Sequence, residues 1–264
     1  MEQRLPGVSI SKKKNNSIYY RSSLTFRTKH ISLGSFDTMI KAHLAYREAW
    51  TLLENSSLMI ESWKKVNILS FDKWVSLINF RDNALYFCNP IYIRQKFFYY
   101  YLSPSIQLVF DLEDLFYYSM HKIMKRGGHL FVSDYGMQYN IMNRYGIKNY
   151  AVEDRDYKFI NGNPHDFRYE NILIINRYQG VLKTEIKGTQ KFRVQLHING
   201  NFLVGTYNTE IEAAIAYNKA VDVVKSQNIQ KNYAVNYIEE ISNSEYAEIY
   251  SHIKVAKKLY HLST

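Results

Sequence analysis

The sequence predicts an α+β protein in which two small modules, each a three-stranded antiparallel sheet with one helix on its back, flank a central helical and ββα region. Two observations lead to this fold class. One pattern of residues occurs near each end of the chain, and in both copies it passes from β-type alternation to helical spacing. The segment between the copies is dense in apolar and aromatic residues, which indicates a packed domain.

The repeat is defined by the order of a few residues in the two copies. In each copy a Gly-Val start precedes a basic, polar stretch, an aromatic–Arg pair, a leucine, a glycine-led turn and an Ala-Tyr-x-x-Ala segment. The first copy contains Gly7-Val8, Tyr20-Arg21, Leu24, Gly34-Ser35-Phe36-Asp37-Thr38 and Ala45-Tyr46 with Ala49. The second contains Gly180-Val181, Phe192-Arg193, Leu196, Gly205-Thr206-Tyr207-Asn208-Thr209 and Ala216-Tyr217 with Ala220.

The first half of each copy has the pattern of β-strands. Residues 20–26 and 192–198 alternate in polarity and are rich in β-formers. Asn199-Gly200, which follows the second of these segments, is typical of a hairpin turn.

The second half of each copy predicts a helix. Ala42, Ala45 and Ala49 share one helical face, where small side chains let the helix lie close to the sheet. Side chains that can cap the helix stand just before it in both copies. They are Asp37 or Thr38 in the first copy and Asn208 or Thr209 in the second.

The charge of the chain favours a polyanionic partner. Lys and Arg number 34 against 24 Asp and Glu, a formal charge of +10. No acidic residue lies between residues 11 and 30, so the outer sheet face of the first copy is basic. Such a face can enter the major groove of DNA, where Arg reads guanine. The residues predicted to contact DNA are Lys12, Lys13, Lys14, Tyr20, Arg21, Arg27, Lys29, Lys183, Lys187, Lys191, Phe192, Arg193 and Gln195.

Both copies resemble the AP2 DNA-binding domain, which is known from plant transcription factors and from phage and bacterial endonucleases. Asn236-Tyr237 in the second copy is similar to the closing Asn–aromatic pair of that family. The resemblance implies that Arg21 and Arg193 contact bases or phosphates. The chain departs from the family in having Tyr20 and Phe192 where Trp is usual, and the second copy is one residue shorter between its Arg and its Gly.

Residues 159–172, Phe-Ile-Asn-Gly-Asn-Pro-His-Asp-Phe-Arg-Tyr-Glu-Asn-Ile, resemble the HNH (ββα-metal) endonuclease motif, which often accompanies AP2 modules in phage homing endonucleases. That chemistry uses a divalent metal and a histidine base. By this resemblance the metal-binding Asp or His falls on Lys158, the base on Phe159 and the Asn that positions it on Phe167. Only the last metal-ligand Asn is present, as Asn171.

The altered HNH positions predict a pseudo-nuclease. Lysine repels a divalent cation and phenylalanine cannot accept a proton, so we expect no catalytic residue, no bound metal, no cofactor and no enzymatic activity. A rival metal set remains open, because His165, Asp166 and Asp156 lie near one another in the sequence.

The rest of the chain completes a five-part division. An aromatic-rich, mainly helical region includes an expected helix over residues 111–125 that stops at Arg126-Gly127-Gly128. A final amphipathic helix is expected over residues 244–262, and the single cysteine, Cys88, is expected to be a buried thiol. The predicted parts are residues 1–54 (first module), 55–128 (helical region), 129–177 (ββα unit), 178–240 (second module) and 241–264 (C-terminal helix).

The N-terminal residues lack the apolar core of a signal peptide, and no apolar run is long enough to cross a membrane. We therefore expect a cytoplasmic protein of a prokaryote or of a phage-infected cell, with no membrane partner. The oligomeric state is left open.

The function predicted from these features is sequence-selective binding of double-stranded DNA without cleavage, by a degenerate homing endonuclease that regulates transcription for a phage or mobile element. Two alternatives stay open. One is an active HNH nicking endonuclease. The other is a phage inhibitor that binds a CRISPR effector nuclease, since AP2-like folds occur among such inhibitors and the 24 tyrosines would suit a protein interface.

Overall fold

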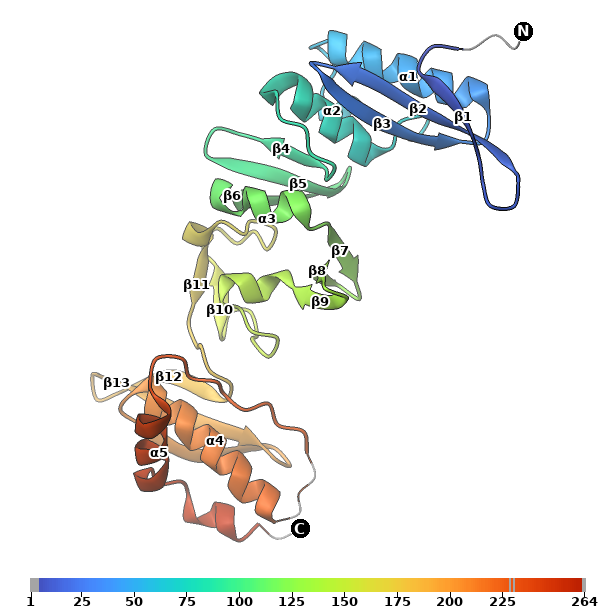
Figure 1. The fold of residues 1–264 in the computed structure, drawn as a ribbon. Coiled ribbons are helices and arrows are strands. Elements are labelled where there is room, and N and C mark those ends of the chain that lie inside the picture. The colour runs from blue at the N-terminus through green and yellow to red at the C-terminus, as the bar shows by residue number, and fades with distance from the viewer. Residues whose placement is uncertain (1–4, 228, 230, 263–264) are drawn as a thin grey trace. The chain divides into compact units, whose positions relative to one another are not determined.

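Three antiparallel strands and one helix form the N-terminal module of the chain (Figure 1). The strands β1 (Val8–Lys12), β2 (Ile18–Phe26) and β3 (Lys29–Phe36) pair in the order β1-β2-β3, and α1 (Met39–Glu54) follows them. One face of α1 packs on the sheet, where Ala42, Ala45 and Ala49 are fully buried. The predicted sheet, helix and alanine face are confirmed here.

The computed structural model describes residues 5–227, 229 and 231–262. Their contacts divide the chain into two units, of which the first comprises residues 1–141 and 163–169 and the second residues 142–162 and 170–264. The N-terminal module belongs to the first unit. The five-part division given above stays a prediction.

The first unit continues with two α-helices and two further antiparallel sheets. Its elements are α2 (Phe71–Asn83), β4 (Ile91–Ile93), β5 (Phe97–Ser103), β6 (Ile106–Asp111), α3 (Leu115–Met120), β7 (Ile123–Arg126), β8 (His129–Asp134) and β9 (Met137–Asn140). The sheets have the orders β4-β5-β6 and β7-β8-β9. One apolar core joins α2 to the module, because Trp74, Leu77 and Phe80 pack with Leu24 and Ala49.

The prediction of a mainly helical region over residues 55–128 is wrong for most of its second half. The aromatic run in β5 alternates, with Phe98 and Tyr100 buried, because aromatic side chains fit a half-buried strand. The helix expected over residues 111–125 extends only from Leu115 to Met120. Gly127-Gly128 then turns β7 into β8 with two positive φ angles, so it is a hairpin turn rather than a helix stop. Cys88 is exposed, contrary to expectation.

The edge of β6 is completed by residues from later in the chain. The backbone N–H of Val109 donates to the carbonyl of His165 (2.9 Å), and that of Phe167 donates to the carbonyl of Val109 (2.8 Å). The ring of Phe167 stacks on Phe110 with centroids 5.4 Å apart. Residues 163–169 therefore belong to the first unit although their neighbours in sequence belong to the second.

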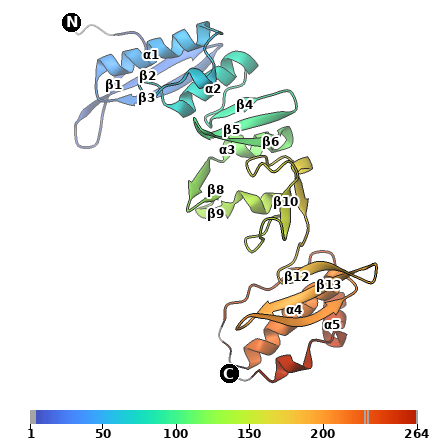
Figure 2. The same ribbon diagram turned by 180° about the vertical axis from the view of Figure 1, so that it is seen from behind.

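The second unit contains the C-terminal module and a short hairpin (Figures 1 and 2). Its elements are β10 (Tyr157–Phe159), β11 (Ile172–Ile174), β12 (Val181–Ile186), β13 (Thr189–His197), β14 (Asn201–Tyr207), α4 (Glu210–Ser226) and α5 (Asn243–His252). The sheet β12-β13-β14 packs on α4, and Tyr246 and Ile249 of α5 pack against the same core. The final helix is shorter than expected: it ends at His252, and a 3₁₀ turn (Lys257–Tyr260) follows.

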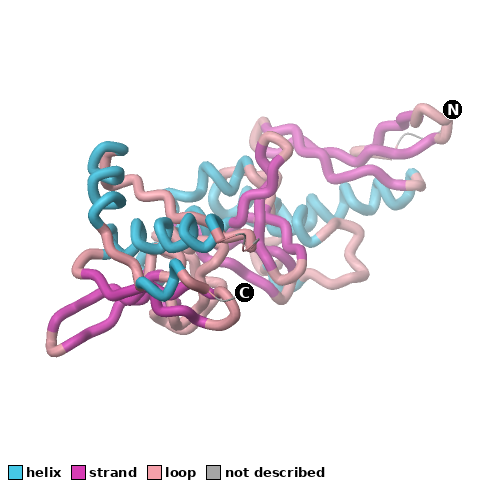
Figure 3. The backbone as a smooth tube through the Cα atoms, turned by 90° about the horizontal axis from the view of Figure 1, so that it is seen from below, coloured by secondary structure: helices cyan, strands magenta, loops and turns pink. Residues whose placement is uncertain are grey.

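The ββα unit predicted for residues 129–177 lacks its helix. Strands β10 and β11 pair as expected, but all residues of this range are described and none is α-helical. Figure 3 colours the helices of the chain cyan and its strands magenta. After β11 the chain bends at residue 175 and turns at residues 178–180 before β12 begins. Asn176 is buried in this connection, where its side chain donates to the carbonyl of Arg155 and accepts from the N–H of Lys183.

The two modules share one strand register. Arg21 lies opposite Ser35 and Arg193 opposite Thr206. In both sheets a β-bulge follows the next pair, so that one extra residue, Leu33 or Val204, interrupts the third strand. The repeated sequence thus produces the same bulged, three-stranded antiparallel sheet twice.

The helices begin in the same way in both modules. The hydroxyl of Thr38 accepts a hydrogen bond from the N–H of Lys41, and that of Thr209 accepts one from Glu212. Thr209 also forms a capping box with Glu212. Of the cap residues predicted as alternatives, the threonine is the cap in each copy.

A glycine at the start of each sheet lies directly against a helix tyrosine. Gly7 has φ +74° and Gly180 has φ +71°. A Cβ atom on Gly7 would lie 2.0 Å from the ring of Tyr46, and one on Gly180 would lie 2.4 Å from the ring of Tyr217. The carbonyl of each glycine accepts a hydrogen bond from the second strand (2.9 and 2.8 Å). Both positions therefore require glycine for space and for conformation.

Asn236 fixes the chain just before Gly180. Its side chain accepts from the N–H of Gln179 (2.7 Å) and donates to the carbonyl of the same residue (3.1 Å). The buried amide of Asn218 bonds the backbone of Asn236 in turn. The neighbouring Tyr237 is exposed. Within the pair Asn236-Tyr237, it is therefore the asparagine that ties the end of the module to the backbone before β12.

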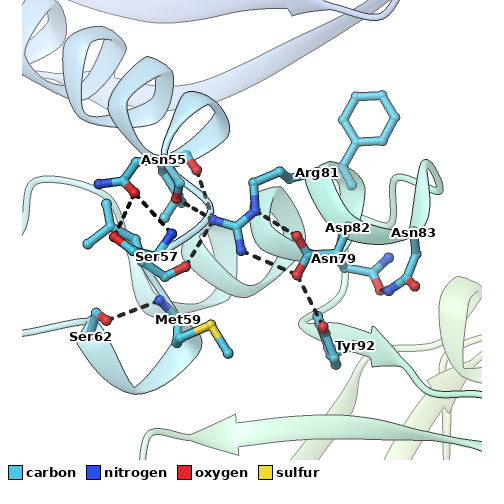
Figure 4. Close-up of polar contacts among 12 residues, drawn as sticks. Asn55, Ser57, Met59, Ser62, Asn79, Arg81, Asp82, Asn83 and Tyr92 are labelled. Atoms are coloured by element: carbon cyan, nitrogen blue, oxygen red, sulfur yellow. Dashed lines mark hydrogen bonds and ion pairs between the residues drawn. The ribbon is translucent and has the colours of Figure 1, made fainter.

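Arg81 of α2 holds the end of α1 (Figure 4). Its Nη1 lies 2.8–3.1 Å from the carbonyl oxygens of Leu52, Asn55 and Leu58, and its Nε donates to Asp82 (2.6 Å). The hydroxyl of Tyr92 donates to the same carboxylate (3.1 Å). A cation at a helix C-terminus satisfies free carbonyls and the helix dipole, so this contact locks the module to α2.

Among the residues that the structure describes, no helix is long and apolar enough to cross a membrane.

Gly180→Ala should lower the free energy of unfolding by about 2–4 kcal/mol, because the new methyl group overlaps Tyr217 in a left-handed backbone conformation. Urea denaturation measures this loss. Gly188→Ala is the matched control, since Gly188 also has positive φ but open space around it, and about 1–2 kcal/mol is expected there. Equal losses in both variants would contradict the steric argument.

Arg81→Lys should destabilise the protein by about 2–4 kcal/mol, because an ammonium group cannot bond the carbonyls and the carboxylate at once. Thermal and urea unfolding report the change. Arg47→Lys, at an exposed site on α1, should leave stability unchanged within experimental error. A small effect of Arg81→Lys would show that the α1 end is held by packing alone.

Candidate nucleic-acid interface

The face of the N-terminal sheet turned away from α1 is polar and free of acidic residues. Strand alternation directs Arg21 and its i±2 neighbours outward, while Ser22 and Leu24 are buried on the other side. Arg21 is exposed at the centre of this face, between Ser9 on β1 and Ser35 on β3. The outward residues are Ser9, Ser11, Tyr19, Arg21, Ser23, Thr25, His30, Ser32 and Ser35.

Tyr19 positions the guanidinium group of Arg21. The hydroxyl of Tyr19 accepts hydrogen bonds from Nη2 (2.7 Å) and Nε (3.2 Å) of Arg21. The bond to Arg21 lowers the pKa of Tyr19, because the guanidinium group stabilises the phenolate. No further hydrogen bond joins the Arg21 side chain to a described residue, so its remaining N–H groups are available to an acceptor outside the protein.

The other basic residues predicted for the first copy fall into two groups. Lys12, Lys13 and Lys14 are exposed at the β1–β2 hairpin, where they can reach a polyanion. Arg27 instead donates to the carbonyl of Phe80 (3.2 Å), and Lys29 lies 5.9 Å from the ring of Tyr86. These last two side chains are turned toward the body of the first unit.

The outer face of the C-terminal sheet has the same strand register and also an arginine at its centre, but most other side chains differ. Arg193 is exposed and paired across the sheet with Leu182 and Thr206. Lys191 occupies the place of Tyr19 and donates to Asn208 rather than bonding the arginine. No hydrogen bond or ion pair joins the Arg193 side chain to a described residue. Gln195 is half-buried on this face, and Lys187 is exposed in the β12–β13 turn.

Three predicted contacts lie away from the two outer faces. Phe192 is buried in the core with Val194 and Leu196, so a role in contacting DNA is wrong for this side chain. Tyr20 is on the α1 side of its sheet, at the position equivalent to Phe192. Lys183 pairs with Phe192 and lies on the α4 side of its strand. The residue that sequence reasoning missed is Tyr19, which the i, i+2 rule would have placed beside Arg21.

The degenerate HNH positions do not form a metal site in the structure. Lys158 is exposed, while Phe159 and Phe167 are buried. Asn171 is also buried, and its Oδ1 accepts from the N–H of Asn161 (2.8 Å). This asparagine therefore holds the loop after β10.

The two aspartates of the rival metal set, Asp166 and Asp156, each form an ion pair with an arginine. Asp166 is bonded by Arg168 (2.7 Å) and Asp156 by Arg155 (2.6 Å). Within the described ranges, no three His, Cys, Asp or Glu side chains are grouped closely enough to hold a metal ion.

Comparison with protein-family models, curated proteins and solved structures finds no match to the chain.

The Tyr19 hydroxyl should titrate below the ordinary tyrosine pKa, and Arg21→Gln should raise its pKa, because the neutral amide no longer stabilises the phenolate. NMR titration of tyrosine labelled at Cζ measures both values. Arg193→Gln is the control and should leave the Tyr19 pKa unchanged. An unaltered pKa in Arg21→Gln would mean that the two side chains are not bonded in solution.

Proposed function

We propose that this protein binds double-stranded DNA selectively through the outer faces of its two terminal sheets and does not cleave it. The observation that carries the proposal is the equivalent placement of Arg21 and Arg193. Each stands exposed at the centre of a three-stranded sheet, opposite Ser35 or Thr206, on a face without acidic side chains. A guanidinium group so placed can donate two hydrogen bonds to guanine or to a phosphate.

The surroundings of the arginines suit a nucleic acid. Hydroxyl and amide side chains on both faces, such as Ser9, Ser35, Thr206 and Gln195, can bond phosphates or base edges. The exposed lysines of the β1–β2 hairpin add positive charge beside Arg21. Two modules on one chain raise the effective concentration of the second contact once the first has formed, so a longer site is bound more tightly.

The resemblance to AP2 modules around a degenerate HNH segment extends the proposal. A homing endonuclease that lost its metal and base positions would keep its DNA-reading modules. Such a protein could regulate transcription for a phage or mobile element. The buried Phe159 and Phe167 support this interpretation, because an apolar side chain at those positions stabilises packing and supplies no proton acceptor.

A protein partner is the second candidate, and one observation favours it. Phe116 and Met120 are spaced at i and i+4 on α3 and are 80% and 70% exposed, and the exposed Leu112 lies in the 3₁₀ helix just before them. Exposed apolar side chains in a row are typical of a protein interface. In this alternative the chain is a phage inhibitor that binds a CRISPR effector nuclease.

One experiment tests these functions together. The full chain is incubated with random-sequence duplexes and magnesium, and both bound sequences and strand breaks are scored. An enriched sequence without nicks supports the proposal. Nicks would establish an active HNH endonuclease, and binding without enrichment would reduce the function to phosphate contact with steep salt dependence. Absence of any binding would favour the protein partner.

Arg21→Ala and Arg193→Ala should each weaken binding to the enriched sequence by roughly 1–3 kcal/mol, because each removes contacts to a base or phosphate. Fluorescence anisotropy at fixed salt gives the dissociation constants. Arg47→Ala removes an exposed arginine from α1, outside the proposed faces, and should have little effect. Unchanged affinity in both test variants would remove the sheets from the DNA contact.

A further inference from the structure

A cavity of about 230 Å³ lies at the edge of the C-terminal sheet, where β12 begins. The pairing of β12 with β13 begins at Val181–Val194, so Gln195 and His197 have no β12 neighbour. The loop that contains Tyr150 and Arg155 encloses the space above them. Every lining residue belongs to the second unit.

Aromatic rings form part of the cavity wall. Tyr217 is buried against Gly180, and the hydroxyl of Tyr150 donates to the carbonyl of Arg177 (2.8 Å). The hydroxyl of Tyr178, a third lining tyrosine, donates to Glu240 (2.7 Å). Tyr178 and Tyr217 are buried, so Tyr150, which is half-buried, is the tyrosine whose ring surface a flat ligand can contact.

Uncharged polar groups form another part of the wall. The amide of Gln195 makes no hydrogen bond with a described residue. His197 Nδ1 and Asn201 Oδ1 are paired (3.2 Å), which leaves the Nε2 atom and the Nδ2 amide free. Oε1 of Gln179, also in the wall, is buried and unbonded within the described chain. The wall thus has both donors and acceptors to offer.

The charge balance disfavours a phosphate in this cavity. Arg155 is its one lining arginine, and the carboxylate of Asp156 bonds it at 2.6 Å. Asp156 is buried while the Arg155 side chain is half exposed, and the carboxylate offsets the charge of this arginine. The ligand that fits best is neutral, flat and rich in edge hydrogen-bonding groups.

The cavity adjoins the proposed DNA contact. Leu182 lines it and is paired with Arg193, and Gln195 follows Arg193 by two residues on the same face. We propose that the cavity receives a single unpaired nucleobase from DNA bound on this face. The base would stack on tyrosine and bond Gln195 and Asn201 through its Watson–Crick edge. This inference rests on the proposed function.

The test compares two duplexes that differ by one unpaired nucleotide, a bulged 5-iodouracil in one of them. The full chain should bind the bulged duplex roughly tenfold more tightly, because the unpaired base gains contacts without the cost of opening a base pair. Ultraviolet light should crosslink the iodouracil to a peptide that contains Tyr150, Tyr178 or Tyr217, identified by mass spectrometry.

Variants assign the preference to the cavity. Asn201→Ala should abolish most of the preference for the bulged duplex while affinity for the paired duplex stays unchanged. Gln195→Ala should weaken binding to both duplexes, and more for the bulged one, because Gln195 also belongs to the proposed DNA-binding face. Asn201 is exposed, so its variant is not expected to impair folding. Ser23→Ala is the matched control, because Ser23 has the equivalent position in the N-terminal sheet.

Equal affinity for the two duplexes, or crosslinks confined to other peptides, would overturn the nucleobase cavity while leaving DNA binding intact. Failure to bind either duplex would overturn the proposed function and the cavity together.

Discussion

Each terminal module depends on one contact between a glycine without a side chain and a tyrosine on the helix behind the sheet. Because Gly7 and Gly180 have no Cβ atom, the rings of Tyr46 and Tyr217 can lie against the backbone where the first strand begins. The same glycines bond the second strand through their carbonyls, so one point sets both the sheet–helix spacing and the strand register. The register in turn decides that Arg21 and Arg193 face outward. The positions of the basic side chains therefore follow from a packing constraint on the opposite side of the sheet.

The sequence predicted the modules well because their signals are local. Alternation, threonine caps and the alanine face are each carried by a few adjacent residues, and all agree with the structure. The prediction failed where contacts between residues far apart in the sequence determine the secondary structure or the direction of a side chain. Residues 111–125 have helical spacing, yet pairing across Gly127-Gly128 draws the end of this range into β7. The repeat, matched by residue type, points to Tyr20, whereas strand alternation places Tyr19 on the face of Arg21. The contact between Arg27 and Phe80 spans 53 positions, and no local pattern indicates it.

The two outer faces are similar in backbone and different in chemistry. On the N-terminal face Tyr19 holds Arg21 in one orientation, so little side-chain freedom would be lost on binding. On the C-terminal face Arg193 has no such support, and Lys191 is bonded to Asn208 instead. In the proposed complex with DNA, Arg193 would therefore lose more side-chain freedom than Arg21.

Residues 163–169 have a consequence for how the protein can be made and divided. They pair with β6 through Val109 and stack Phe167 on Phe110, but they are synthesised after β10, a strand of the second unit. The backbone therefore passes between the units at three points, after residues 141, 162 and 169. Synthesis must continue past residue 169 before Phe167 can stack on Phe110, and a truncation at residue 141 would leave the β6 edge open to other chains. The segment that resembles a nuclease motif thus completes the edge of a sheet whose strands are synthesised before it.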